Sequence, residues 1–79
     1  MDKFVIYVIG VGYYTGKTFK FPNAKEKDVL YAKTTNDPNK AKQYTSYGMA
    51  LKGMKALKAK CEVSNCITKR LSECEVLSE

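Results

Sequence analysis

The hydrophobic stretch that begins at Phe4 leads into Gly16-Lys17-Thr18, which imitates part of a phosphate-binding motif. A P-loop has a glycine, four intervening residues and then Gly-Lys-Ser or Gly-Lys-Thr, placed between a strand and a helix. In this chain Val11 stands where the first glycine belongs, and the Phe-Lys-Phe-Pro sequence after Thr18 is not the start of a helix. We therefore interpret Thr15-Gly16-Lys17 as a tight β-turn, in which glycine provides a positive φ and lysine is exposed.

The chain contains few residues that could support other catalytic or metal-binding chemistry. The chain contains no histidine, which is the commonest general base and metal ligand. Cys61, Cys66 and Cys74 are expected to be reduced thiols, and they lack the fourth ligand that a zinc site needs. A cysteine nucleophile would have only lysines as nearby bases. The sequence therefore predicts no enzyme, no metal site and no cofactor.

Positive charge is concentrated in one block of the chain. Fourteen Lys and Arg against eight Asp and Glu give a net charge of +6, and six lysines but no acid lie between Pro38 and Cys61. Phosphates attract such charge and bases stack on tyrosine, so the block predicts a nucleic-acid-binding surface. The alternative is that these lysines form the solvated face of an amphipathic helix. The candidate nucleic-acid-binding residues are Lys40, Lys42, Tyr44, Lys52 and Lys55.

A second candidate surface surrounds the predicted turn. Tyr13 and Tyr14 precede this turn, and Lys17 and Lys20 lie within or just after it. Tyrosine is enriched at protein interfaces. These four residues are therefore predicted to form an aromatic and basic tip that binds a partner protein, although strand tyrosines also pack into cores.

The N-terminal half has the pattern of a β-hairpin and a third strand. Residues 4–14 are β-branched or aromatic and apolar on both sides, which predicts a central strand or one covered on both faces. Gly10 and Gly12 would mark a bulge or a close backbone approach within it. Thr18 to Phe21 would return as a second strand with Phe19 and Phe21 facing inward, residues 24–28 would form a loop, and 29–35 a third strand.

Helix signals dominate the middle of the chain. Asp37 is a predicted N-cap with Pro38 at the first helical position, and Thr45-Ser46 can cap a longer helix that ends near Lys60. The longer helix has an apolar stripe at three- and four-residue spacing, which needs a partner surface. Gly53 flanks this stripe and is predicted to allow close contact with the sheet. The stripe consists of Tyr47, Ala50, Leu51, Met54, Leu57 and Cys61.

The C-terminal region fits two patterns. Residues 66–71 alternate as a strand does, while Ile67, Leu71, Cys74 and Leu77 also match a helical stripe. We favour the strand, because it would complete the sheet beside the hairpin. Residues 73–79 are expected to be a frayed or exposed tail.

These elements predict one domain over residues 1–79. The fold class is α+β, with a small antiparallel sheet of three or four strands packed on one main amphipathic helix. No apolar run has the roughly 18–20 residues of a membrane span, and no cleavage site follows the first strand. We therefore expect a complete cytoplasmic polypeptide without membrane contact.

Three features together resemble small phage and prophage proteins of Gram-positive bacteria. They are Gly-Tyr-Tyr-x-Gly from Gly12 to Gly16, Asp-Pro-x-Lys-Ala-Lys-x-Tyr-x-Ser from Asp37 to Ser46, and the Ala/Leu/Lys helix that follows. The resemblance implies a stoichiometric inhibitor of a host or defence protein, of which anti-CRISPR proteins are the best-known class. Many anti-CRISPR proteins are acidic mimics of nucleic acid, and this chain departs from them in being basic. An inhibitor of this kind would cover an acidic protein surface or a nucleic acid held by its target.

The functional prediction is therefore a non-enzymatic binding module that inhibits or modulates a host or defence protein. The alternative is a basic nucleic-acid-binding protein that uses the lysine-rich helix face. A homodimer formed through an exposed sheet edge is also compatible with the pattern.

Overall fold

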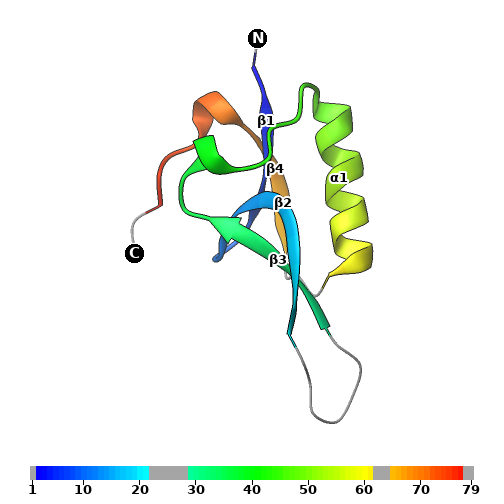
Figure 1. Ribbon diagram of the computed structural model, residues 1–79. Helices are drawn as coiled ribbons and strands as arrows, with labels where there is room; N and C mark the ends of the chain where they lie inside the picture. Colours follow the sequence, from blue (N-terminus) through cyan, green and yellow to red (C-terminus); the bar gives the residue numbers. More distant parts are fainter. Residues whose placement is uncertain (1, 22–28, 62–64, 78–79) are drawn as a thin grey trace.

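A computed structural model describes residues 2–21, 29–61 and 65–77 of the chain. Four strands form one sheet in the order β3-β2-β1-β4, every neighbouring pair is antiparallel, and helix α1 packs against β1 and β4 (Figure 1). The predicted α+β class is confirmed. The elements are β1 (Phe4–Val8), β2 (Gly12–Phe21), β3 (Val29–Thr35), the 3-10 helix η1 (Pro38–Lys40), α1 (Tyr47–Lys60), β4 (Cys66–Arg70) and the 3-10 helix η2 (Leu71–Glu73).

Strand β1 lies at the centre of the molecule and is covered on both faces. Ile6 and Val8 belong to the apolar cluster that contains Ala50 and Leu57 of α1. Val5 belongs to a second cluster, on the opposite face of the sheet. Successive side chains of a strand point to opposite faces of the sheet. A strand that is apolar at every position therefore contributes to two cores, one on each face. The prediction of a strand covered on both sides is confirmed.

The turn of the first hairpin lies earlier than the sequence predicted. Strand β1 ends at Val8, and the turn that follows has Gly10 at φ +80°, with the Val11 N–H donating to the Val8 carbonyl at 2.9 Å. The predicted turn at 15–17 is wrong, because Gly16 lies inside β2 at φ +89°, where the register with β3 shifts between Tyr14 and Thr18. Both places carry a glycine that can take a positive φ, so local composition did not distinguish the turn from the bulge.

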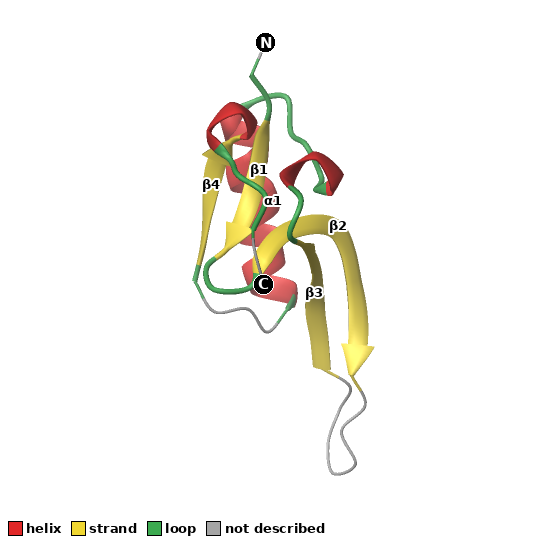
Figure 2. Cartoon of the chain, turned by 90° about the vertical axis from the view of Figure 1, so that its left-hand side faces the viewer, coloured by secondary structure: helices red, strands yellow, loops and turns green. Residues whose placement is uncertain are grey.

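The bulge makes β2 leave β1 and curl away with β3 (Figure 2). Another segment then takes the vacant edge of β1. Phe4 and Tyr44 exchange backbone hydrogen bonds of 2.8 and 2.7 Å, and the Lys42 N–H donates to the Tyr14 carbonyl at 3.0 Å. The chain between η1 and α1 is thereby fixed against both β1 and β2.

Helix α1 begins and ends where the sequence predicted. Ser46 is its N-cap, with the side-chain oxygen accepting from the Met49 N–H at 3.2 Å. Ala50 and Leu57 are buried, whereas Tyr47, the first residue of the predicted stripe, is 54% exposed. Tyr47 therefore borders the core, with its ring edge-on to Phe4 at 5.8 Å between centroids.

Gly53 allows a close contact between α1 and Tyr44. A Cβ atom at this position would lie 2.6 Å from the Tyr44 hydroxyl oxygen and 2.9 Å from the adjoining ring carbon. The sequence predicted that Gly53 would allow close contact with the sheet. In the structure Gly53 contacts the side chain of Tyr44, whose backbone pairs with Phe4 at the start of β1.

The C-terminal segment covers the second face of the sheet. Leu71, Cys74 and Leu77 pack on the cluster of Val5 and Tyr13, and the Leu77 N–H donates to the Asn36 carbonyl at 2.8 Å. The segment is therefore not frayed, since Glu73 belongs to η2 and Leu77 is anchored, although Glu73, Glu75 and Val76 are exposed as expected. Residues 78–79 lie outside the described part of the chain. The strand predicted at 66–71 is confirmed as β4.

The third strand and the cap of η1 were predicted correctly, whereas the orientation of Phe19 was not. The third strand has the predicted bounds, and Asp37 caps η1 by accepting from the Asn39 N–H at 2.9 Å. Phe19 was predicted to face inward, which is wrong, because it is 47% exposed and stacks on Tyr31. The side chain of Phe21 and the loop at 24–28 lie outside the described residues.

In the ranges that the structure describes, no helix is both long and apolar enough to cross a bilayer.

Candidate nucleic-acid interface

The predicted partner-binding tip does not form around Tyr13 and Tyr14. Tyr13 is 1% exposed, and its hydroxyl donates to the Glu75 carbonyl at 2.8 Å. Tyr14 is buried against the α1 side of the sheet. Their prediction as exposed partner contacts is wrong, because the turn lies before them and leaves them on the inner part of β2, where neighbouring residues face opposite cores.

Lys17 and Lys20 remain exposed, but on a different structure from the one predicted. Both lie in β2, which continues as a strand through Gly16-Lys17-Thr18 to Phe21. The described residues after the tripeptide, up to Phe21, continue the strand, so this stretch lacks the strand-turn-helix geometry of a phosphate-binding loop. The two lysines are therefore surface cations of the β2–β3 ribbon.

Tyr44, predicted to stack on bases, is also buried. Its ring lies against Gly53 of α1, and burial raises the pKa of its hydroxyl above the ordinary value. The Lys42 ammonium lies over the same ring, 5.5 Å from the centroid, in a cation–π arrangement. Tyr44 therefore acts as a support that positions Lys42 beside α1, and a base cannot stack on it in this arrangement.

Helix α1 brings four lysines to the surface on and beside its solvent side. Lys52, Lys55, Lys58 and Lys60 are all exposed, and none of the residues 47–60 is acidic. Lys60 lies eight positions after Lys52, or about 12 Å along the helix axis. One strand of a duplex presents about three to four phosphates over that distance.

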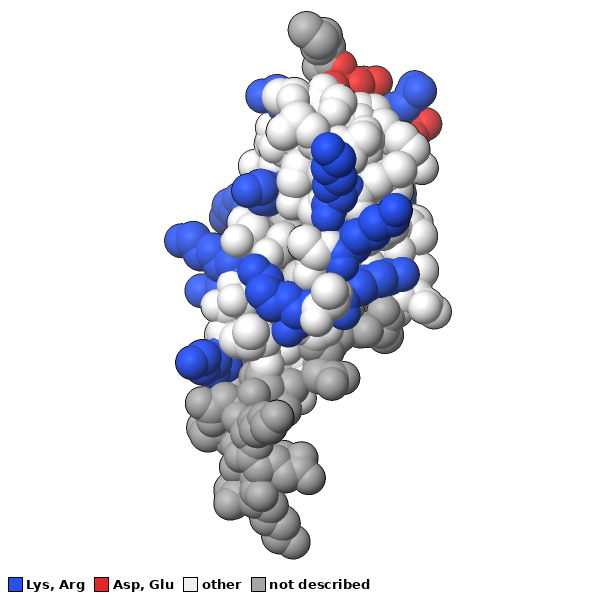
Figure 3. Space-filling view, turned by 90° about the vertical axis from the view of Figure 1, so that its right-hand side faces the viewer, with Lys and Arg blue, Asp and Glu red and all other residues white. Residues whose placement is uncertain are grey.

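We define the lysine face as these four helical residues together with Lys42. Lys42 joins them because Tyr44, over which it lies, packs on Gly53 in the same helix. Viewed from the α1 side, lysine and arginine side chains spread across the surface, and acidic side chains are visible only at its upper end (Figure 3). The arrangement can attract a polyanion over an area wider than one helix.

Lys40 does not belong to this face. It is exposed in η1, which lies on the far side of the sheet from α1 (Figures 1 and 2). Of the predicted nucleic-acid-binding residues, the structure brings together Lys42, Lys52 and Lys55. It separates Lys40 and buries Tyr44.

Sequence reasoning left Lys58 and Lys60 out of the candidate site. Both belong to the same block without acidic residues, so the whole block predicts the charged surface better than the individual residues chosen from it. Lys58 also lies near the sheet, since its charge lowers the pKa of the Cys66 thiol, although burial has the larger effect and raises it.

The thiols are poorly placed for chemistry. Burial raises the pKa of Cys66 and of Cys74, so both are neutral thiols near pH 7, and the thiolate is the reactive form. Among the residues with described positions, no three His, Cys, Asp or Glu side chains gather as metal ligands would. The lysine face is therefore the strongest candidate site in the described structure.

No protein-family model, curated protein or solved structure matches this chain.

Proposed function

We propose that the protein is a non-enzymatic module that holds the phosphate backbone of a nucleic acid against its lysine face. The observation that carries the proposal is the exposure of five lysines, from α1 and the segment before it, around a helix without acidic residues. Lysine is a flexible, hydrated point charge that suits phosphates without selecting a base. Binding is therefore expected to be independent of sequence.

Tyrosine stacking is not part of this proposal. Tyr44 is buried, so the lysine face would act mainly through charge. Backbone binding releases counterions, and the logarithm of the binding constant then falls by about 0.9 per contacted phosphate for each tenfold rise in salt. Five contacts would give a slope of about −4.5 on duplex DNA.

The test is a salt titration of binding to fluorescently labelled duplex DNA and RNA, followed by fluorescence anisotropy. The double substitution Lys52→Gln/Lys55→Gln is expected to lower the magnitude of the slope by about 1.8, because two contacts are lost. Lys69→Gln is the control. Its ammonium lies over the Tyr7 ring, and Tyr7 packs with the cluster on the face opposite α1, so this change should leave the slope unaltered.

Two results would overturn the proposal. One is the absence of binding at low salt. The other is an effect of the single control substitution half as large as that of the double variant, which would indicate attraction to net charge without a binding face. If the lysine face instead binds an acidic protein, the double variant will lose that partner while the wild-type protein fails to bind either nucleic acid.

A further inference from the structure

Strand β4 forms an edge of the sheet, and its outward backbone groups can be identified. The Asn65 carbonyl accepts from the Ile9 N–H at 2.9 Å, and the Leu71 N–H donates to the Lys3 carbonyl at 2.7 Å. In an antiparallel pair the direction of the backbone groups alternates along the strand. Odd-numbered residues of β4 therefore bond β1, and Cys66, Thr68 and Arg70 direct their N–H and C=O groups away from the sheet.

These outward groups are largely unoccupied in the described structure. The Arg70 carbonyl accepts from the Cys74 thiol at 3.1 Å. No described residue bonds the outward N–H or C=O of Thr68, which is partly exposed, or the outward N–H of Arg70, which is exposed, whereas Cys66 is buried. An unpaired row of this kind is a template for another strand.

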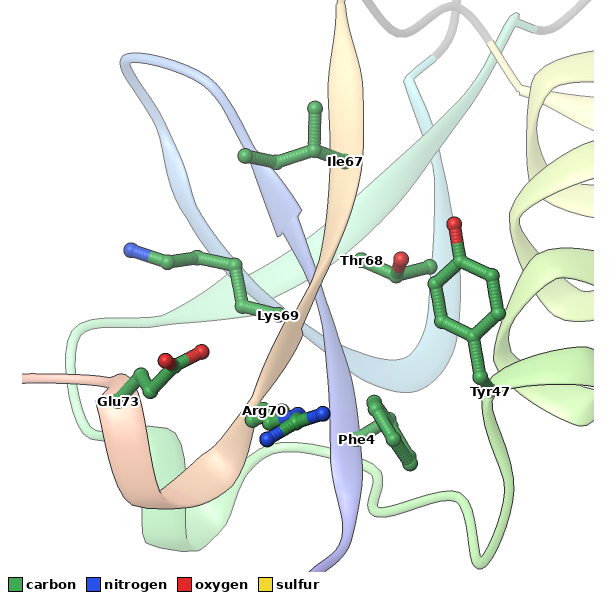
Figure 4. Close-up of a pocket in the computed structure, with 7 residues that line it drawn as sticks. All are labelled: Phe4, Tyr47, Ile67, Thr68, Lys69, Arg70 and Glu73. Carbon is green, nitrogen blue, oxygen red and sulfur yellow. The ribbon is translucent and has the colours of Figure 1, made fainter.

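An open groove of about 520 Å³ runs along this edge (Figure 4). Thr68 extends toward Tyr47 on the α1 side of β4, and Ile67 and Lys69 extend from the other side. Tyr47 and Ile67 are 54% and 44% exposed. Two bases and one acid line the groove, namely Lys69, Arg70 and Glu73.

We propose that the outer edge of β4 accepts an extended, acidic segment of a partner protein as a fifth strand. The added strand would bond Thr68 and the N–H of Arg70 through its backbone. Its side chains would lie on Tyr47 on one face and beside Ile67 and Lys69 on the other. This surface is separate from the lysine face and does not depend on the function proposed for it.

Charge complementarity distinguishes the acidic segment from a second copy of this chain. Antiparallel pairing of two β4 strands centred on Thr68 would bring Lys69 and Arg70 of both copies to one interface. Like charges across a pair of strands are unfavourable, whereas an acidic strand would meet Lys69 and Arg70 favourably.

The probe is a capped peptide of nine residues in which valine and glutamate alternate, and the control peptide replaces glutamate by lysine. Binding is measured by chemical-shift changes on the isotope-labelled protein. We expect the glutamate peptide to shift residues 65–71, and the lysine peptide to bind more weakly. Shifts confined to the lysine face would overturn the proposal, as would equal binding of the two peptides.

Backbone recognition is tested by N-methylation of the peptide. Because alternate residues of an added strand face β4, methylation of a central valine and of a central glutamate should have unequal effects. One of them should weaken binding by about two- to tenfold, which corresponds to the loss of a hydrogen bond. Equal effects would show that no strand is added.

A matched pair of protein variants completes the test. Thr68→Pro removes an outward N–H without removing a bond to β1, and Thr68→Val keeps that N–H. The proline variant should lose peptide binding and the valine variant should keep it. If the proline variant fails to fold, the N-methylated peptides give the answer alone. Wild-type self-association through β4 would identify a second copy as the occupant and refute the acidic partner.

Discussion

The contact among Gly53, Tyr44 and Lys42 connects the core of this protein to its charged surface. Gly53 leaves room for the hydroxyl end of the Tyr44 ring, and the Lys42 ammonium lies over the same ring. A residue that lacks a side chain thereby determines where a cation lies. The helix loses some intrinsic stability at this position, since glycine is about 1 kcal/mol worse than alanine in a helix.

Two alanine substitutions in α1 should consequently have opposite effects. Gly48→Ala is expected to stabilise the protein by up to about 1 kcal/mol, because nothing lies within 4 Å of the added Cβ. Gly53→Ala should destabilise it by about 1–3 kcal/mol, because the methyl group would overlap a buried ring. Urea denaturation measures the change in the free energy of unfolding for both variants.

A rescue experiment isolates the cause. In the Gly53→Ala background, Tyr44→Phe removes the hydroxyl oxygen that would lie 2.6 Å from the new Cβ, so part of the stability should return. If Gly53→Ala alone is as stable as the wild-type protein, the close contact does not exist in solution.

At the scale of elements, the C-terminal segment acts as a cover for the sheet. Residues 71–77 have little regular structure beyond η2, yet they bury the face of β1 and β2 that α1 does not reach. The Tyr13 hydroxyl and the Asn36 carbonyl hold this segment by hydrogen bonds at Glu75 and Leu77. Its stability contribution should therefore come from a few anchored side chains.

Neighbouring substitutions in this segment provide a matched comparison. Leu77→Ala should cost about 1–3 kcal/mol, which is less than a fully buried leucine because Leu77 is half-buried. Val76→Ala should change stability by less than about 0.5 kcal/mol, because Val76 is 66% exposed. Thermal denaturation compares the two, and equal effects would mean that the segment does not cover the core in solution.

Elements with a long regular pattern or a clear cap were predictable from the sequence. Helix α1 and β3 have periodicity and flanking signals that agree, and both appear where expected. The first turn was not predictable, because Gly10 and Gly16 both allow a positive φ, and only pairing with β3 assigns one to the turn and the other to the bulge. The anchoring of 74–77 depends on contacts more than 60 residues apart, such as that of Tyr13 with Glu75, which no local window contains.

The same distinction applies to the candidate sites. The exposure of the lysines was predictable, because they lie in a block without acidic residues, and Lys42, Lys52 and Lys55 form a charged surface. The exposure of the tyrosines was not predictable, because an aromatic residue fits a core and an interface equally well. Tyr13, Tyr14 and Tyr44 are all buried. The groove beside β4 was missed since Tyr47 belongs to the apolar stripe in sequence and lies at its margin in the structure.

For the whole molecule, the buried tyrosines and thiols predict a loss of stability in alkali. Burial raises the pKa of Cys66 and Cys74 above 9.0 and that of Tyr13, Tyr14 and Tyr44 above 10.0. Below these values both states keep the proton, so the contribution to stability is fully present. As the pH rises, the unfolded chain releases protons that the native state retains, and the free energy of unfolding falls.

The fall should begin near pH 9 with the thiols and steepen near pH 10 with the tyrosines, by at most about 1.4 kcal/mol per pH unit for each retained proton. Urea denaturation between pH 7 and pH 10 measures it. In Cys66→Ala the early part should be shallower, because one of the two thiols is gone. A free energy of unfolding that is constant over this range would contradict the burial of these groups.

The role of the whole molecule as an inhibitor of a host or defence protein stays a prediction, as does its cytoplasmic location. The two proposed surfaces suit such a role, since the lysine face would hold nucleic acid while the edge of β4 held a protein. Binding of both probes by one molecule at the same time is the observation that would favour it.

The position of β1 between β2 and β4 also has a consequence for biosynthesis. Residues 4–8 leave the ribosome well before residues 66–70, which form one of their two neighbouring strands, and before the residues that cover one face of the sheet. A nascent chain therefore exposes its most apolar strand until those residues have emerged. Such dependence on distant partners is a high contact order, which slows folding.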